Sequence, residues 1–197
     1  MKVAVFSGGE YVETKLLPYD KLICADKGYE YALNLGLTPD LTLGDFDSLG
    51  YQPKNAEIYP IDKNYSDTQL AVIKALELGA TEIDLYFTLG GRIDHELFNI
   101  DILSFCKNKG VKASIINGKT YMTLIDGKGD YPAKAGETVS LLPFSSVVHI
   151  IKSDGLKYSL DNLTAVKGET LTLSNVALKS SVHIEVESGE LLYISFL

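Results

Sequence analysis

The stretch EIDLYFTLGGRIDHELFNIDILSFCKNKGVKASIIN, residues 82–117, decides the fold because apolar runs and a helical pattern alternate within it. Residues 82–91 predict a strand that ends in paired glycines, and residues 95–110 predict a helix that stops at a glycine. Residues 112–117 predict a second strand. Strands that alternate with helices at this spacing indicate a mostly parallel α/β sheet.

The same alternation extends toward the N-terminus. One helix is expected over residues 29–36, and a second is expected to begin after Ser66, its cap, and to reach about Leu78, before Gly79. The predicted strands and extended segments cover residues 3–7, 22–25, 41–48 and 56–61.

Helical periodicity vanishes after about Gly118, and short strands separated by turns take over. The turns are expected at 127–130 and 188–189. The predicted strands lie within residues 121–126, 137–144, 147–155, 171–175 and 181–197. The predicted fold class is therefore α/β plus all-β: an N-terminal mostly parallel sheet flanked by helices over residues 1–120, and a C-terminal antiparallel β-sandwich-like domain over residues 121–197.

Composition and charge exclude several classes of protein. The chain has 197 residues, of which 46% are hydrophobic and 22% charged, as in globular proteins with a real core. A net charge of −8 argues against a nucleic-acid partner. No apolar run approaches the ~20 residues of a membrane helix, and the N-terminus predicts a buried strand and no signal peptide, so we expect a cytoplasmic protein. Cys24 and Cys106 are expected in the core.

Aspartates follow four of the five predicted strands of the first domain. Asp26 follows the strand at 22–25, and the pair Asp45 and Asp47 follows the apolar residues of LTLG. Asp67 and Asp94 come after the next two strands. Ligands of open α/β sheets bind at the carboxyl ends of the strands, so the sequence predicts one acidic cluster at that rim.

The segment Asp45-Phe46-Asp47 suits a divalent cation. If it is extended, both carboxylates point the same way, and Phe46 points into the core. Two carboxylates on one face repel each other unless a cation lies between them. Mg²⁺ is a hard cation that takes oxygen ligands and commonly retains substrate phosphates, so it is the predicted metal.

Basic residues and glycines stand at the same strand ends. Lys27, Lys63 and Arg92, with glycines that let backbone N–H groups approach, suit a polyphosphate. Taken singly, each feature has a simpler interpretation: a D-x-D can be a solvated turn, Gly90-Gly91 a strand terminator, and Arg92 with Asp94 a surface ion pair. Their coincidence at four strand ends favours a functional site.

The order and spacing of five segments resemble the thiamin pyrophosphokinase family over nearly the whole chain. In the family's pattern these segments carry an Asp before a basic or Gly residue, G-D-F-D-S, Lys-Asp-x-Thr-Asp, G-G-R-x-D-H and two carboxy-terminal stretches. The matching segments here are ADKGYEYALNLGLTPDLTLGDFDSL (25–49), YPIDKNYSDTQLA (59–71), LGGRIDHELFNI (89–100), GLKYSLDNLT (155–164) and LTLSN (171–175).

The resemblance implies Mg²⁺-dependent transfer of diphosphate from ATP to the hydroxyethyl group of thiamin, giving thiamin diphosphate and AMP. It implies a homodimer whose active sites lie between the α/β domain of one subunit and the β domain of the other. Residues 1–120 would then form the catalytic domain, which binds nucleotide and metal. Residues 121–197 would bind thiamin and form the dimer.

Carried over by position, the resemblance also implies a set of site residues. The catalytic residues would be Asp45, Asp47, Asp67 and Asp94, with Asp45, Asp47 and Asp67 on the metal. A carboxylate near the thiamin hydroxyl could accept its proton, and our hypothesis assigns this to Asp94. The nucleotide-binding residues would be Asp26, Lys27, Gly44, Lys63, Gly90, Gly91, Arg92 and Asn99. Thiamin would contact Ser174 and Asn175.

Three features depart from the family's pattern. Asn64 stands where the family has Asp, which removes one charge from the site. Ser66 replaces Thr and keeps the hydroxyl. The chain has no Trp, so an aromatic that stacks on thiamin must be Tyr or Phe, and Tyr158 is a candidate.

Three other functions fit parts of the pattern. A metal-dependent phosphohydrolase also uses D-x-D, but normally after the first strand and followed by Thr or Val, whereas here Ser48 follows. A non-catalytic nucleotide or thiamin binder is compatible with Asn64. Transfer of diphosphate to another heterocyclic alcohol, such as a pterin, would use the same polyphosphate motifs, and only the Ser174-Asn175 segment favours thiamin.

Overall fold

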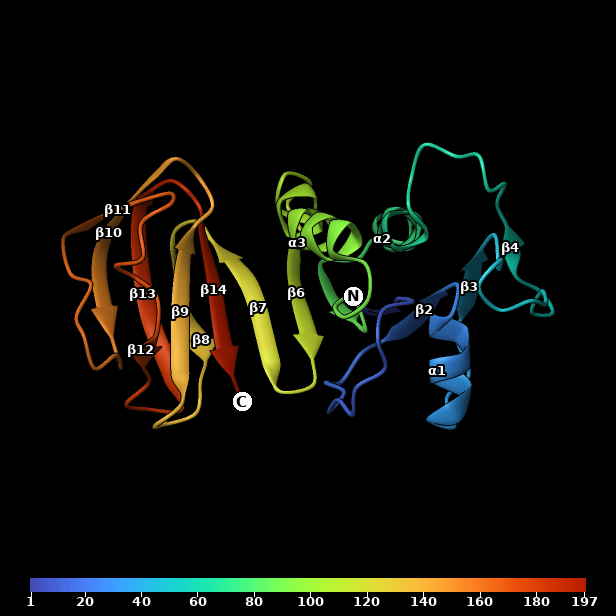
Figure 1. The fold of residues 1–197 in the computed structure, drawn as a ribbon, viewed down its shortest axis with the longest axis horizontal. Coiled ribbons are helices and arrows are strands. Elements are labelled where there is room, and N and C mark those ends of the chain that lie inside the picture. Colours follow the sequence, from blue (N-terminus) through green and yellow to red (C-terminus); the bar gives the residue numbers. More distant parts are fainter. The chain divides into compact units, whose positions relative to one another are not determined.

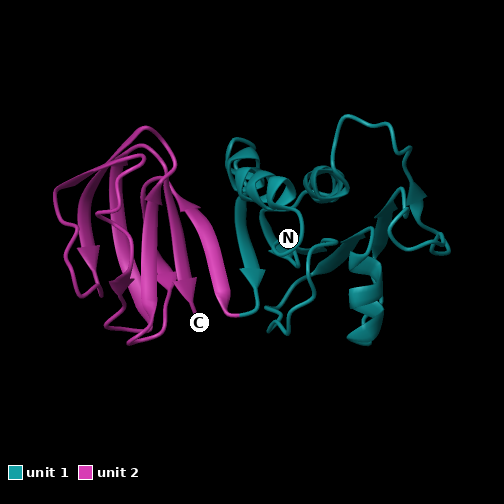
Figure 2. Ribbon diagram, in the orientation of Figure 1, with its two compact units in different colours: residues 1–118 teal, residues 119–197 magenta.

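The computed structural model describes all residues, 1–197, and divides into two compact units, Met1–Gly118 and Lys119–Leu197 (Figure 2). The first contains β1 (Lys2–Phe6), β2 (Lys21–Ala25), α1 (Gly28–Asn34), β3 (Leu41–Gly44), β4 (Glu57–Ile58), α2 (Asp67–Glu77), β5 (Glu82–Tyr86), α3 (Ile93–Lys107) and β6 (Lys112–Asn117). The second contains β7 (Thr120–Ile125), β8 (Lys128–Pro132), β9 (Thr138–Pro143), β10 (Val147–Asp154), β11 (Leu163–Val166), β12 (Asn175–Val176), β13 (Ser181–Ser188) and β14 (Leu191–Phe196).

The strands of the first unit form a parallel sheet in the order β6-β5-β1-β2-β3-β4 (Figure 1). Helices α2 and α3 lie over one face and α1 over the other (Figure 1). The central strands are buried on both faces, as Val3 to Phe6 show with 0% exposure, which is why they read as continuous apolar runs. The predicted parallel α/β sheet is confirmed.

The strand order reverses at β1. From β1 the chain proceeds through β2 and β3 to the edge strand β4, and it then returns to place β5 on the other side of β1. Such a reversal separates the loops that follow the two central strands, and it is where open α/β sheets bind ligands. The strand order therefore predicts a ligand-binding site at the carboxyl ends of β1 and its neighbouring strands.

Helix α2 begins and ends within one residue of the predicted limits, and local contacts at both ends explain why. Ser66 is extended, and its Oγ accepts a hydrogen bond from the N–H of Gln69 at 3.2 Å, so it caps the first turn. At the other end Gly79 has φ 84°, a left-handed conformation that glycine adopts easily. The cap places Asp67, the first helical residue, at the carboxyl edge of the sheet.

The second unit is an antiparallel sandwich. One sheet has the order β12-β9-β14-β7 and the other β11-β10-β13-β8. Alternate residues of both sheets enclose one core, which includes Val139, Leu141, Ile150, Ile184 and Tyr193. The predicted antiparallel β-sandwich-like fold of the C-terminal part is confirmed. None of the helices in the chain is long and apolar enough to cross a membrane.

Some predicted elements are wrong. The strand expected at 171–175 is a turn, and β12 begins only at Asn175. The turn expected at 127–130 is largely strand β8, because Lys128–Pro132 pairs with β13 over Ser181–Glu185. Cross-strand pairing here overrides the local turn preference of its glycines. Strand β11 was not predicted at all.

Candidate functional site

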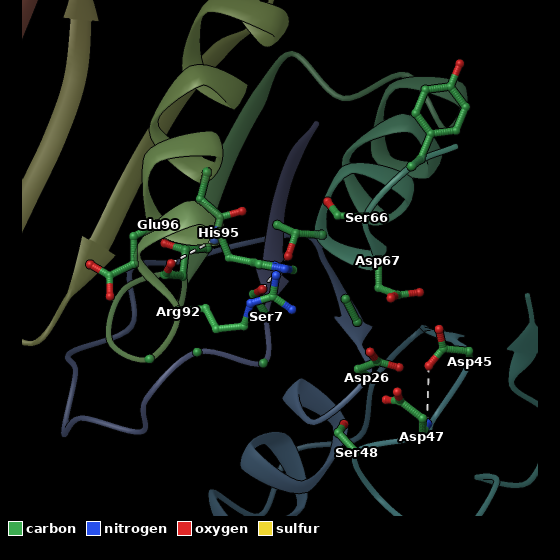
Figure 3. A pocket seen from close by; sticks show the side chains of 18 of the residues that line it. Ser7, Asp26, Asp45, Asp47, Ser48, Ser66, Asp67, Arg92, His95 and Glu96 are labelled. Carbon is green, nitrogen blue, oxygen red and sulfur yellow. Dashed lines mark hydrogen bonds between the residues drawn. The ribbon is translucent and has the colours of Figure 1, made fainter. Parts of the chain in front are cut away.

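A cavity of about 650 Å³ opens in the first unit where β1, β2, β3 and β5 end (Figure 3). Its lining also includes the beginnings of α2 and α3 and the loop before α2. The predicted site residues that line it are Asp26, Asp45, Asp47, Lys63, Asp67, Gly90, Gly91, Arg92 and Asn99. The structure thus brings together side chains from four strand ends, as the sequence pattern indicated.

Three carboxylates meet on one side of this cavity. Asp26 follows β2, Asp45 follows β3 and Asp67 begins α2, and one oxygen from each lies within 4.8 Å of the others (Figure 3). Each is only partly buried. Asp47 lines the cavity but is exposed and is not part of this triad. We call Asp26, Asp45 and Asp67 the acidic triad.

The segment around Phe46 is not extended, so that prediction is wrong. Phe46 has φ 60° and only 2% exposure, which means that it reaches the core, as expected, from a left-handed turn. Its N–H donates to Asp26 Oδ1 at 3.0 Å, and the N–H of Asp47 donates to Asp45 Oδ1 at 3.2 Å. These two bonds orient Asp26 and Asp45 toward each other and leave Asp47 outside the triad.

Gly44 is required by the position of Asp26. It has φ 147°, and a Cβ at this residue would lie 2.1 Å from Asp26 Oδ1. Asp26 itself has φ 46°, unusual for a residue with a side chain. Gly44 is buried beneath the carboxylate and does not line the cavity, so its part in the site is to leave room for Asp26.

Lys63 lies against two members of the triad. Its Nζ is 2.6 Å from Asp45 Oδ2 and 3.2 Å from Asp67 Oδ1. The second contact has ion-pair distance without hydrogen-bond orientation, and Asp67 Oδ1 is buried with no hydrogen-bond partner in the protein. One ammonium therefore neutralises only part of the charge of the acidic triad.

Burial and charge shift the pKa values of the triad in different directions. Burial, together with the neighbouring Asp67 and Asp45, raises the pKa of Asp26 to about 7. Burial also raises the pKa of Asp67, although Lys63 opposes the shift. Burial would raise the pKa of Asp45 too, but the hydrogen bonds from Lys63 and from the N–H of Asp47 lower it overall.

These shifts predict how stability changes with pH in metal-free protein. The folded-state pKa of Asp26, about 7, lies above the unfolded value of about 3.9, so between these pH values the folded protein holds a proton that the unfolded chain has lost. The stability from this proton is full below about pH 4 and is lost as pH rises through 7. Urea unfolding in EDTA from pH 5 to 8 should show a decline that is smaller in Asp26→Asn. Equal slopes in both proteins would contradict this assignment.

Four of the predicted site residues make no contact with the acidic triad that resembles that of Lys63. Asp94 is exposed and does not line the cavity, and Arg92 Nη2 and Nε hold its two oxygens at 2.5 and 3.1 Å. This pairing lowers the pKa of Asp94 to about 2. Lys27 is exposed, with its Nζ 5.7 Å from the Tyr31 ring centroid. Asn99 is buried, and its Nδ2 donates to the carbonyl of Thr88 at 2.8 Å.

The residues expected to meet thiamin lie in the second unit. Asn175 is 3% exposed, and its side-chain amide both accepts from the N–H of Tyr158 at 3.1 Å and donates to the Tyr158 carbonyl at 2.7 Å. Ser174 is exposed with φ 54°, and its N–H donates to Ser140 Oγ at 3.1 Å. Asn175 thus fixes the backbone of Tyr158, a residue that is 58% exposed.

Sequence reasoning missed several residues of the cavity lining. Three buried ones carry hydroxyls: Ser7 after β1, Thr68 in the first turn of α2, and Thr88 after β5. The signal for Ser7 and Thr88 was the same strand-end position that singled out the aspartates, but a Ser or Thr beside apolar residues resembles an ordinary strand residue. His95 and Glu96, at the start of α3, also line the cavity.

The fold and the cavity define a class of protein: an α/β unit with an acidic and basic cavity at a topological switch point, followed by an antiparallel β unit. A model of the thiamin pyrophosphokinase catalytic domain matches residues 15–115, and a model of the vitamin B1 binding domain of thiamin pyrophosphokinase matches residues 128–191. The chain belongs to the thiamin pyrophosphokinase family. The family's reaction is that of a thiamine diphosphokinase, a transferase that uses ATP, and the family prediction is confirmed.

Known relatives agree with this membership. The chain is 30% identical over 183 residues to thiamine pyrophosphokinase of Bacillus subtilis, with 87% of this chain and 85% of that protein covered. The crystal structure of the Bacillus subtilis protein is similar, with a TM-score of 0.85, 27% identity and 98% of each chain covered. The structure of thiamin pyrophosphokinase from Geobacillus thermodenitrificans gives a TM-score of 0.83 and 26% identity, covering 98% of this chain and 96% of that one.

Proposed function

We propose that this chain transfers diphosphate from ATP to the hydroxyl group of thiamin, giving thiamin diphosphate and AMP, with Mg²⁺ held by the acidic triad. The observation that carries this proposal is the cavity at the switch point, where three carboxylates meet, Lys63 contacts two of them and Arg92 also lines the cavity. Family membership supplies the substrates. Because ATP is an intracellular substrate, we place the reaction in the cytoplasm.

The triad fits a hard divalent cation. Its oxygens lie within 4.8 Å of one another, and Asp67 Oδ1 is buried without a hydrogen-bond partner, as expected of an atom that a cation would satisfy. When bound, Mg²⁺ neutralises charge on phosphate oxygens and stabilises the leaving group. We propose Asp26, Asp45 and Asp67 as its protein ligands. Asp47, which the sequence placed on the metal, lines the cavity beside them.

The basic residues are proposed to position the polyphosphate. Lys63 and Arg92 both line the cavity, and Gly90 and Gly91 expose backbone between β5 and α3. The two bonds from Arg92 to Asp94 hold the guanidinium in one orientation. We infer that Asp94 acts mainly by orienting Arg92, because a carboxylate with a pKa of about 2 is a poor proton acceptor at neutral pH.

We also propose that the second unit binds thiamin and that the chain works as a homodimer. The exposed ring of Tyr158 supports the first part, since Asn175 holds its backbone in place and a thiazolium cation can stack on an aromatic face. Ser174, on the same segment, offers a hydroxyl. The dimer rests on family resemblance. Analytical ultracentrifugation at micromolar concentration measures whether the chain is a monomer or a dimer.

The experiment that tests the function is AMP formation from ATP and Mg²⁺, with and without thiamin, followed by mass analysis of the product. AMP that depends on thiamin, with a product of the mass of thiamin diphosphate, supports the proposal. ADP or free phosphate without thiamin would indicate a phosphohydrolase. Binding without turnover would indicate a binding protein, and Asn64→Asp would then be the first variant to make, because Asn64 lines the cavity.

Lys63 gives a prediction about metal affinity that is separate from turnover. Its ammonium lies on two oxygens of the triad, so it competes with Mg²⁺ for them. Lys63→Met should therefore bind Mg²⁺ more tightly in the absence of nucleotide, by roughly 3- to 30-fold, while it binds ATP more weakly. Isothermal calorimetry measures both affinities. Lys109→Met, an exposed change near the end of α3, is the control, and unchanged Mg²⁺ affinity in Lys63→Met would refute the competition.

A further inference from the structure

Three buried hydroxyl groups line the cavity beside the acidic triad. Ser7 follows β1, Thr68 lies in the first turn of α2 and Thr88 follows β5. Their exposed fractions are 4%, 8% and 1%. Hydroxyls this deep in a protein normally have hydrogen-bond partners, because the loss of water must be compensated.

Thr88 has no such partner for its side chain. Its Oγ1 is buried and makes no hydrogen bond to the protein, while its carbonyl accepts from Asn99 Nδ2 at 2.8 Å. The hydrogen bond from Asn99 fixes the backbone of Thr88, and this sets the position of the Thr88 side chain. Since Thr88 lines the cavity, a partner for its hydroxyl can come from that side.

Ser7 and Thr68 satisfy each other only in part. Their two hydroxyls share one hydrogen bond, in which either can donate. One hydrogen is used in that bond, so the second hydroxyl hydrogen of the pair remains available to an acceptor. The three side chains together therefore offer two O–H donors and carry no charge.

The strand order separates two of these hydroxyls, those of Thr88 and Ser7, from Asp26 and Asp45. Along β5-β1-β2-β3 the groups at the strand ends are Thr88, Ser7, Asp26 and Asp45 in turn. Neighbouring strands lie about 4.8 Å apart. The ends of β5 and β1 therefore present hydroxyl groups, and the adjacent ends of β2 and β3 present carboxylates.

We propose that Ser7, Thr68 and Thr88 form a seat for a phosphoryl group of ATP, next to the metal-binding triad. The proposal rests on the proposed function and adds to it the residues that receive one phosphoryl group. Phosphoryl oxygens only accept hydrogen bonds, and the seat offers donors without a carboxylate. A polyphosphate bound through the triad at one end can thus continue over β1 and β5 toward Arg92.

The deciding variant is Thr88→Val, which keeps the shape and removes the hydroxyl. Because that hydroxyl has no protein partner, the thermal midpoint should stay equal or rise. The dissociation constant for Mg²⁺-ATP should increase about 5- to 30-fold, measured by calorimetry without thiamin. The dissociation constant for inorganic tripolyphosphate should increase by the same factor, because the seat contacts phosphate and not the base. Thr88→Ser should restore both affinities.

Thr14→Val is the matched control. The Thr14 hydroxyl lies outside the cavity, donates to the Val12 carbonyl at 2.7 Å and accepts from the N–H of Gly118 at 2.8 Å. Its loss should lower stability and leave nucleotide affinity unchanged, the opposite of Thr88→Val. Ser7→Ala is a second variant that should weaken both polyphosphates.

The outcomes separate this proposal from the proposed function. Wild-type affinity for ATP and tripolyphosphate in both Thr88→Val and Ser7→Ala would overturn the seat, even if the wild-type protein makes thiamin diphosphate. A loss confined to ATP would also overturn it, because the contact would then be to the nucleoside. Wild-type protein that binds neither polyphosphate would overturn the seat and the proposed function together.

Discussion

Asp45→Asn is expected to lower turnover by roughly 10²–10³-fold, the loss typical when one preorganised charge-stabilising group is removed from an active site. The asparagine keeps the shape and a neutral oxygen, but the acidic triad loses a charge and Lys63 loses its 2.6 Å partner. Asp67→Asn should have an effect of similar size, because Asp67 Oδ1 is the buried oxygen with no hydrogen bond. The Mg²⁺ concentration at half-maximal rate should rise in both variants.

Steady-state rates over a range of Mg²⁺ concentrations test this expectation, with circular dichroism to establish that each variant is folded. Asp101→Asn is the matched control, since Asp101 is exposed on α3 and does not line the cavity. Near-normal rates in both Asp45→Asn and Asp67→Asn would remove the basis for placing the metal at the triad.

Gly44→Ala is expected to lower both the stability of the first unit and its affinity for Mg²⁺. The new Cβ would lie 2.1 Å from Asp26 Oδ1, and a φ of 147° is unfavourable for any residue with a side chain. We expect a loss of about 2–4 kcal/mol in the free energy of unfolding, from overpacking and backbone strain together. Asp26 must also move, so Mg²⁺ affinity should fall along with stability.

Urea unfolding and Mg²⁺ titration measure the two effects separately. Gly127→Ala is the control, because nothing lies within 4 Å of a Cβ at that residue and its φ is outside the left-handed range. It should change stability by less than about 0.5 kcal/mol. A Gly44→Ala protein with wild-type stability and Mg²⁺ affinity would contradict the contact between Gly44 and Asp26.

The sequence predicted the parallel sheet well because its central strands are buried on both faces. A strand such as β1 then has no polar face, and its apolar run and terminal glycines mark its limits. The acidic residues at the strand ends were predictable for the same reason, since a parallel sheet collects those ends at one edge. The family followed from the order and spacing of the motifs.

The membership of the triad could not be predicted from alternation along the strand. Phe46 enters the core from a left-handed turn, and its N–H bonds to Asp26, a residue far away in the sequence. That tertiary contact selects Asp26 and leaves Asp47 outside the triad. In the second unit β8 was missed because its pairing with β13 outweighs the turn preference of Gly129 and the preceding Gly127.

The turn at Phe46 links the acidic triad to the packing of the hydrophobic interior. The Phe46 ring is buried in the core, and the Phe46 N–H donates to Asp26. The two residues next to Phe46 are Asp45, a member of the acidic triad, and Asp47, whose N–H donates to Asp45. A mutation that loosens the interior near this ring will shift the carboxylates before it unfolds the chain. Under the proposed function, the first effect of such a mutation is a higher Mg²⁺ concentration at half-maximal rate, in a chain that is still folded.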